Sequence, residues 1–149
     1  MRKIENQRSM IGRSVKYVIA ALLCMFCLGL AGCSGSAKLA DCYDKDTLEK
    51  DAKATIELGE SGDYEGLIAK FDESISGSLT KEGYEQYLEL VKSKGSFRKF
   101  GNVAFVGQHV DETDSDYAAV VVVAEYENGK LQYVVGYDED MELVQYTVK

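Results

Sequence analysis

The chain has 149 residues, with 17 Lys and Arg against 25 Asp and Glu, a formal net charge of −8, four cysteines, and neither proline nor tryptophan. This length suffices for one domain with one hydrophobic core. The negative charge excludes binding that depends on attraction to nucleic acid or to an anionic lipid surface, because like charges repel. We therefore expect no nucleic-acid partner, and we interpret the acidic surface as a source of solubility.

The first residues have the pattern of a secretion signal. Five basic side chains and one acid lie in residues 1–16, and residues 17–30 are uncharged and almost wholly apolar. This apolar stretch is shorter than the roughly 20 residues of a membrane-spanning helix. The pattern therefore favours a cleaved signal peptide over a permanent membrane helix.

A cysteine closes the apolar stretch. The sequence Leu30-Ala31-Gly32-Cys33 resembles the bacterial lipobox. The resemblance implies that Cys33 receives a diacylglyceryl group, that the chain is cut before it, and that the lipid anchors the secreted protein to the outer face of the cell membrane. On this interpretation residues 1–32 are signal peptide, residues 33–43 are the lipidated end and a tether, and residues 44–149 are a single domain.

Loss of the signal changes both the charge and the cysteine count. The signal carries five basic residues and one acid, so the mature chain keeps 12 basic and 24 acidic residues, a net charge of −12. Cys24 and Cys27 leave with the signal, and Cys33 is occupied by lipid. Cys42 alone remains, so we expect a free thiol and no intramolecular disulfide.

The first half of the domain has the pattern of helices. Apolar residues recur there at a spacing of three and four, and acids or threonine precede each stripe while glycine follows it. Three helices are therefore predicted, each with its capping residue and its end: Asp46 with Gly59 or Gly62, Asp63 with a short stripe that reaches Phe71, and Thr80 with Gly95.

The second half has the pattern of strands joined by short turns. Four strands are predicted, at residues 97–110, 117–126, 131–137 and 141–148. Asn128-Gly129 is the preferred dipeptide of a type I′ hairpin turn. Residues 117–126 are apolar on both faces, so we expect both faces of this strand to be covered, one by the helices and the other by the curl of the sheet or by a second subunit.

Four short motifs resemble a small bacterial domain, domain of unknown function family 3887, of the nuclear transport factor 2-like superfamily. They are Ser61-Gly62-Asp63-Tyr64, Phe71-Asp72, Leu79-Thr80 and Lys94-Gly95-Ser96-Phe97. The resemblance covers about residues 46–148. It implies an α+β fold in which three N-terminal helices pack on a curled, cone-shaped, four-stranded antiparallel sheet, and it implies a cell-surface setting but no activity.

Tyrosine is the most suggestive residue type in the sequence, with ten copies. Its ring and hydroxyl suit the wall of an apolar cavity or an interface. A pocket or interface is therefore predicted at six tyrosines on the apolar stripes, which equally suit an ordinary core: Tyr84, Tyr87, Tyr117, Tyr126, Tyr133 and Tyr137.

Residues that could carry catalysis or bind a metal are few. His109 is the single histidine and has no recognisable partner, although a general base needs one. Carboxylates crowd residues 111–116 and could offer oxygen ligands to Ca²⁺, but the glycine and distal glutamate of an EF-hand loop are missing. We therefore expect no catalytic residue, no metal and no cofactor, and a solvated turn at residues 111–116.

Three functions stay open. The favoured one is a non-catalytic, membrane-anchored module that binds a small ligand or a peptide in the mouth of the cone. The second is a protein–protein module, as a homodimer through the face of the sheet or with another cell-envelope protein. The third is a small enzyme that uses an acid or a tyrosine of the cavity.

Overall fold

The computed structural model describes residues 38–149, so the predicted signal peptide and the predicted lipidation site Cys33 lie outside the described residues. The elements in this range are α2 (Lys45–Glu60), α3 (Tyr64–Ile68), the short 3₁₀ helix η2 (Ser76–Ser78), α4 (Lys81–Ser93), β1 (Phe97–Val110), β2 (Ser115–Tyr126), β3 (Gly129–Tyr137) and β4 (Leu143–Val148). Within this range, no helix combines the length and the apolar character needed to span a membrane.

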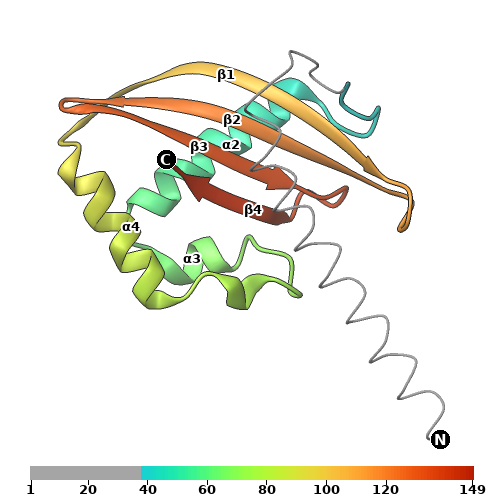
Figure 1. The fold of residues 1–149 in the computed structure, drawn as a ribbon, viewed down its shortest axis with the longest axis horizontal. Helices are drawn as coiled ribbons and strands as arrows, with labels where there is room; N and C mark the ends of the chain where they lie inside the picture. Colours follow the sequence, from blue (N-terminus) through green and yellow to red (C-terminus); the bar gives the residue numbers. More distant parts are fainter. Residues whose placement is uncertain (1–37) are drawn as a thin grey trace, which may run out of the picture. The chain divides into compact units, whose positions relative to one another are not determined.

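The strands form one antiparallel sheet in the order β1-β2-β3-β4. The sheet is curled and arches over the helices (Figure 1), which confirms the predicted α+β class with a four-stranded antiparallel sheet. The bounds of β1 agree with the prediction. Strands β2 and β3 begin earlier than predicted. Ser115 already pairs with Val110 of β1, and Gly129 already pairs with Tyr126 of β2.

Helix caps explain where the helices begin and end. The Asp63 side chain accepts from Gly66 N at 2.9 Å, and Thr80 Oγ1 accepts from Gly83 N at 3.1 Å, as predicted. The cap of α2 is Asp44 and not Asp46: Asp44 Oδ1 accepts from the Thr47 backbone amide at 2.8 Å, which places the cap two residues before the predicted one.

The predicted type I′ turn at Asn128-Gly129 is wrong. Tyr126 pairs with Gly129, so Glu127 and Asn128 are the two loop residues, and neither has the positive φ that a type I′ turn needs. The turn instead packs against the end of α4, where the Glu127 and Asn128 amides donate to the carbonyls of Ser96 and Lys94 at 3.0 and 2.9 Å.

Strand β4 begins at Leu143, two residues later than predicted. Met141 has a φ of 63°, which takes it out of an extended conformation. Leu143 is fixed by a bridge to the loop after α3, because its amide donates to the Lys70 carbonyl at 2.8 Å and its carbonyl accepts from Asp72 N at 3.0 Å. This contact also closes part of the outer edge of β4.

The two faces of the sheet differ in what covers them. The inner face carries Val120 and Val122, which have no exposed surface and pack with core residues from α2, α3 and α4. The outer face carries Val121 and Val123, which remain half-buried. The helices of residues 38–149 therefore cover the inner face, as predicted. On the outer face Ala119 and Val134 are buried while Val121 and Val123 are half-buried, and cover of this face by a second subunit stays a prediction.

Candidate functional site

Four tyrosine hydroxyls and one carboxylate are connected in the core, and we call them the tyrosine–Glu60 network. The Tyr133 hydroxyl donates to Glu60 Oε1 at 2.7 Å and lies 3.0 Å from the Tyr126 hydroxyl, which also donates to Glu60. The Tyr87 hydroxyl lies 3.5 Å from that of Tyr133 and 3.0 Å from that of Tyr146. Hydroxyls from α4, β2, β3 and β4 therefore converge on the last residue of α2.

Burial decides the chemistry of these hydroxyls. It raises the pKa of Tyr87 to about 12 and raises the pKa values of Tyr126 and Tyr133 further above the ordinary value of a phenol. The phenols stay protonated near neutral pH and act as hydrogen-bond donors, because ionisation in the core would be costly. Every buried side-chain polar atom of residues 38–149 has a partner, so the network is a satisfied polar core.

Tyr137 belongs to a second polar group around Asp51 of α2. Its hydroxyl donates to Asp51 Oδ2 at 2.9 Å, and Lys70 Nζ donates to Asp51 Oδ1 at 2.8 Å. Thr55 Oγ1 donates to the same carboxylate at 3.3 Å. Burial and the Asp51 charge raise the pKa of Tyr137, so its hydroxyl also stays protonated.

The remaining two predicted tyrosines, Tyr84 and Tyr117, donate no hydrogen bond to Glu60 or to Asp51. Tyr84 packs on Tyr87 but donates its hydroxyl to the Gly59 carbonyl at 2.7 Å. Tyr117 pairs with Gln108 on the outer face and is half-buried. Of the six predicted tyrosines, the structure brings together Tyr84, Tyr87, Tyr126 and Tyr133 and keeps Tyr117 and Tyr137 apart from them.

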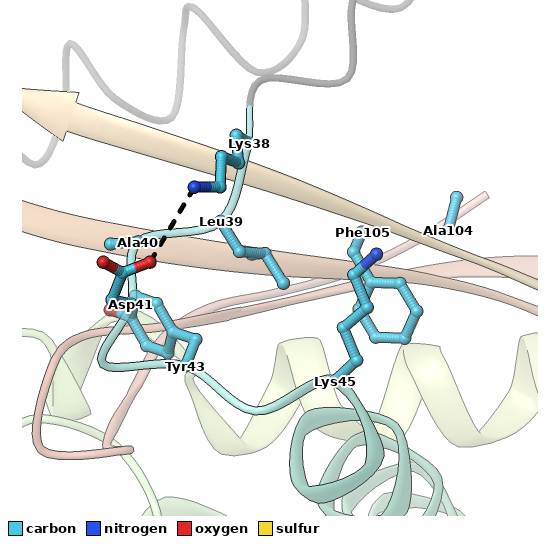
Figure 2. A pocket seen from close by; sticks show the side chains of 8 residues that line it. All are labelled: Lys38, Leu39, Ala40, Asp41, Tyr43, Lys45, Ala104 and Phe105. Carbon is cyan, nitrogen blue, oxygen red and sulfur yellow. Dashed lines mark ion pairs between the residues drawn. The ribbon is translucent and has the colours of Figure 1, made fainter.

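A pocket of about 700 Å³ lies between the segment before α2 and the edge strand β1. Figure 2 shows the side chains that line it: Lys38, Leu39, Ala40, Asp41, Tyr43, Lys45, Ala104 and Phe105. None of the six predicted tyrosines is among them, so the predicted tyrosine wall is not the wall of this pocket.

The pocket combines ammonium groups with an apolar floor. Lys45 Nζ lies 5.8 Å from the centre of the Phe105 ring, within the range of a cation–π contact. Lys38 Nζ lies 3.8 Å from Asp41 Oδ1, but both side chains are exposed and such a pair is weak. Among the described residues, no acidic side chain lies within 4.0 Å of Lys45 Nζ. Lys45 is therefore available to an anionic group of a ligand.

The wall of the pocket is a segment that the sequence assigned to the tether. Leu39 packs partly against the core, and the buried Tyr43 donates its hydroxyl to a backbone carbonyl of β2 at 2.8 Å. A Cβ atom on Gly107 would overlap the Lys38 carbonyl oxygen, so glycine is needed where the segment crosses β1. Residues 38–43 therefore pack on the domain in the structure.

His109 has the acidic partner that the sequence did not reveal. Its Nδ1 atom lies 2.9 Å from Asp116 Oδ1, and its Nε2 atom lies 3.5 Å from Asp111 and 3.8 Å from Asp114. The hydrogen bond with Asp116 raises the pKa of the imidazole. His109, Asp111 and Asp114 are exposed at the end of the β1–β2 hairpin and Asp116 is half-buried, so the predicted acidic turn surrounds a histidine.

Three carboxylates meet elsewhere, at the loop before β4. Ligand atoms of Asp72, Asp138 and Glu142 lie within 4.8 Å of one another. Desolvation raises the pKa values of Asp138 and Glu142, and repulsion from the neighbouring carboxylates of Asp72 and Asp140 adds to the rise of both. Asp138 Oδ1 already accepts from the amides of Asp140 and Glu142 at 3.0 and 2.9 Å. These hydrogen bonds to the loop's own backbone explain why Asp138 and Glu142 lie close together.

Sequence reasoning missed Glu60 and Asp51, the two carboxylates that receive the buried tyrosine hydroxyls. Both occur on α2, and the sequence distinguishes them from the other acids of this helix only by their position beside the apolar stripe that includes Ala52 and Gly59. Their partners come from strands more than 60 residues away, so no local pattern identifies them.

Comparisons with known proteins give two matches. The model of a family described as Protein of unknown function (DUF3887) matches residues 52–145. The NMR structure of a protein from Ruminococcus gnavus ATCC 29149 superimposes with a TM-score of 0.67 and 38% sequence identity, over 74% of this chain and 95% of that chain. No protein of curated function matches.

Proposed function

The chain belongs to the family of proteins of unknown function named DUF3887, and we propose that it is a membrane-anchored, extracytoplasmic lipoprotein with a ligand-binding domain. The lipobox-like sequence of residues 30–33 supports the anchoring. The domain, in this proposal, has the cone-shaped fold of the nuclear transport factor 2-like superfamily. It is a non-catalytic module that binds a small ligand or a peptide. The observation that carries the proposal is the pocket beside Lys45 and Phe105.

The position of the pocket in the chain supports this proposal. Lys38 lies only five residues after Cys33, which spans no more than about 18 Å of extended chain. A lipid on Cys33 would therefore hold the pocket close to the membrane surface. The acidic domain gains nothing from charge at an anionic membrane, so the lipid supplies the attachment.

Anchoring is tested by Cys33→Ala. We expect loss of lipid and accumulation of the uncut precursor, because the lipid-bearing cysteine is the residue that the processing depends on. Radiolabelled palmitate incorporation and the apparent mass of the protein in membrane fractions measure both effects. Normal cleavage and normal fractionation of the variant would contradict the lipoprotein assignment.

Binding in the pocket is tested with 1-naphthoate, an aromatic carboxylate that matches an ammonium beside an aromatic ring. In ¹H–¹⁵N spectra of the full-length chain in detergent, we expect titration to shift the signals of residues 38–45 and 104–105. Lys45→Gln should weaken binding about tenfold, since a charge-assisted contact contributes about 1.5 kcal/mol. Lys50→Gln, on an exposed position of the same helix, is the matched control. Shifts spread evenly over the domain, or equal binding by both variants, would overturn the assignment of this pocket.

A second candidate function is association through the outer face of the sheet. Val121 and Val123 lie there half-buried, although a run of valines usually lies between two covering layers. A homodimer would cover them. Sedimentation of the purified chain distinguishes a monomer from a dimer.

A further inference from the structure

Strand β1 forms a free edge of the sheet. It pairs with β2 on one side, and among residues 38–149 the other side receives no backbone hydrogen bond from another segment. The opposite edge is different, because β4 is bridged to the loop after α3 through Leu143. An unpaired edge presents amides and carbonyls that an added strand can bind.

The regular part of this edge adjoins the pocket. The register with β2 shifts between Phe97 and Lys99 and again between Phe100 and Val103, and it continues without a shift from Val103 onward. At Gly107 the segment that contains Lys38 crosses the strand. Residues 103–106 therefore offer a regular stretch of edge, and two of them, 104 and 105, also line the pocket.

Basic side chains gather along β1, although acids outnumber bases two to one in the mature chain. Two lysines of α2 lie over aromatic rings of β1: Lys45 Nζ is 5.8 Å from the Phe105 ring and Lys53 Nζ is 5.7 Å from the Phe100 ring. The strand itself carries exposed Arg98 and Lys99 near its start, and Lys38 lies at the far end of the pocket. Three of these bases are paired with a carboxylate: Lys38 with Asp41, Lys53 with Glu49, and Lys99 with Glu125.

This charge pattern selects the kind of strand that could pair here. An acidic segment would be attracted to Lys45 and Arg98, because among residues 38–149 no carboxylate lies within 4.0 Å of either side chain. Lysines on an edge also discourage unspecific pairing. Protection against unspecific pairing requires only the lysines. The pocket beside the Lys45 ammonium group is an additional feature, and it can receive a side chain of an added strand.

We propose that residues 103–106 of β1 bind an extended acidic peptide segment as a fifth strand, with one carboxylate side chain of the peptide in the pocket beside Lys45. This proposal rests on the ligand-binding role of the pocket and names its ligand class. Main-chain hydrogen bonds to the edge supply affinity, and the pocket supplies specificity, as in other cases of strand addition.

The test uses fluorescein-labelled peptides of alternating valine and threonine, about seven residues long, the length of an ordinary strand. The parent peptide has glutamate at its centre, a second has lysine there, and a third is the parent with alternate backbone nitrogens methylated. Fluorescence anisotropy with the full-length chain in detergent measures binding. We expect the lysine and the methylated peptides each to bind at least about tenfold more weakly than the parent.

Variants connect the peptide to the pocket. Lys45→Gln should weaken the glutamate peptide about tenfold and leave the lysine peptide unchanged, while Lys50→Gln should change neither. Equal binding of the methylated and parent peptides would exclude strand addition, and equal binding of the glutamate and lysine peptides would exclude the acidic class. If naphthoate still binds in the pocket in either case, the ligand-binding role survives and the strand proposal alone fails. If naphthoate does not bind there, the ligand-binding role itself fails.

Discussion

Along β2, Val120 and Val122 point toward the helices and have no exposed surface, whereas Val121 and Val123 point to the opposite face and stay half-buried. The four residues are identical in type and adjacent in sequence. Only the elements packed on each face distinguish them. The contrast teaches that a run of valines indicates a central strand but does not indicate how many of its faces are covered.

The largest expected effect comes from placing a charge on the inner face of β2. Val122→Asp would leave an unpaired carboxylate in the core and should lower the free energy of unfolding by at least about 3 kcal/mol. Val121→Asp, on the half-exposed face, should cost about 1 kcal/mol or less. Urea unfolding followed by circular dichroism measures both. Similar losses for the two variants would mean that the outer face is also covered, and a halved sedimentation mass for Val121→Asp would show that a second copy covers it.

Hydroxyl deletion gives the next effect. Tyr133→Phe removes the central donor of the tyrosine–Glu60 network, and we expect a loss of about 1 to 2 kcal/mol, because Glu60 and Tyr126 each lose a partner in a buried place. Tyr117→Phe is the control on the outer face and should stay within about 0.5 kcal/mol of the parent. An equal change in the free energy of unfolding for Tyr133→Phe and Tyr117→Phe would contradict the view that only the inner-face hydroxyl stabilises the fold.

A pH-dependent effect is expected beyond the helices, at the exposed end of the β1–β2 hairpin. The hydrogen bond with Asp116 raises the pKa of His109, so the folded state binds this proton more tightly than the unfolded chain does. The resulting stability is complete below the unfolded pKa, near 6.5, and is lost as the pH rises through the higher folded value. Urea midpoints between pH 5.5 and 8.5 should fall with pH in the parent and fall less in His109→Gln. Parallel curves would contradict the ion pair.

The smallest effect concerns Cys42. It is exposed and unpaired in the described part of the chain, so Cys42→Ser should shift the unfolding free energy by less than about 0.5 kcal/mol. The thiol should react with Ellman's reagent in the folded protein. A mass two units lower than the reduced mass would reveal a disulfide and contradict this prediction.

Local chemistry explains which parts of the fold could be predicted. The caps at Asp63 and Thr80 and the stop at Gly95 depend on neighbouring residues, so the sequence alone indicates them. The cap of α2 was misplaced because Asp44 and Asp46 are both suitable acids, and the contact with Thr47 decides between them. The hairpin turn was misassigned because contacts with α4 determine its conformation.

The candidate site depends on long-range packing and was therefore harder to predict. Composition marks residues 38–43 as a tether, yet their side chains form a wall of the pocket because Gly107 allows them to cross β1 closely. The tyrosine positions could be predicted from their apolar stripes. Their convergence on Glu60 could not be predicted, because it depends on the register of β2 with β3 and on where α2 packs against the sheet.

The tyrosine–Glu60 network also bears on how the domain opens. Its hydroxyls come from α4, β2, β3 and β4 and meet at the end of α2, so side chains that are buried or half-buried connect each of these elements to the others. Lifting α4 alone would remove Tyr87 and with it the hydrogen-bond partner of the Tyr146 hydroxyl. The helix and the three strands therefore form one cooperative unit, whose amides exchange with solvent at a common rate, while the exposed tip of the β1–β2 hairpin exchanges independently.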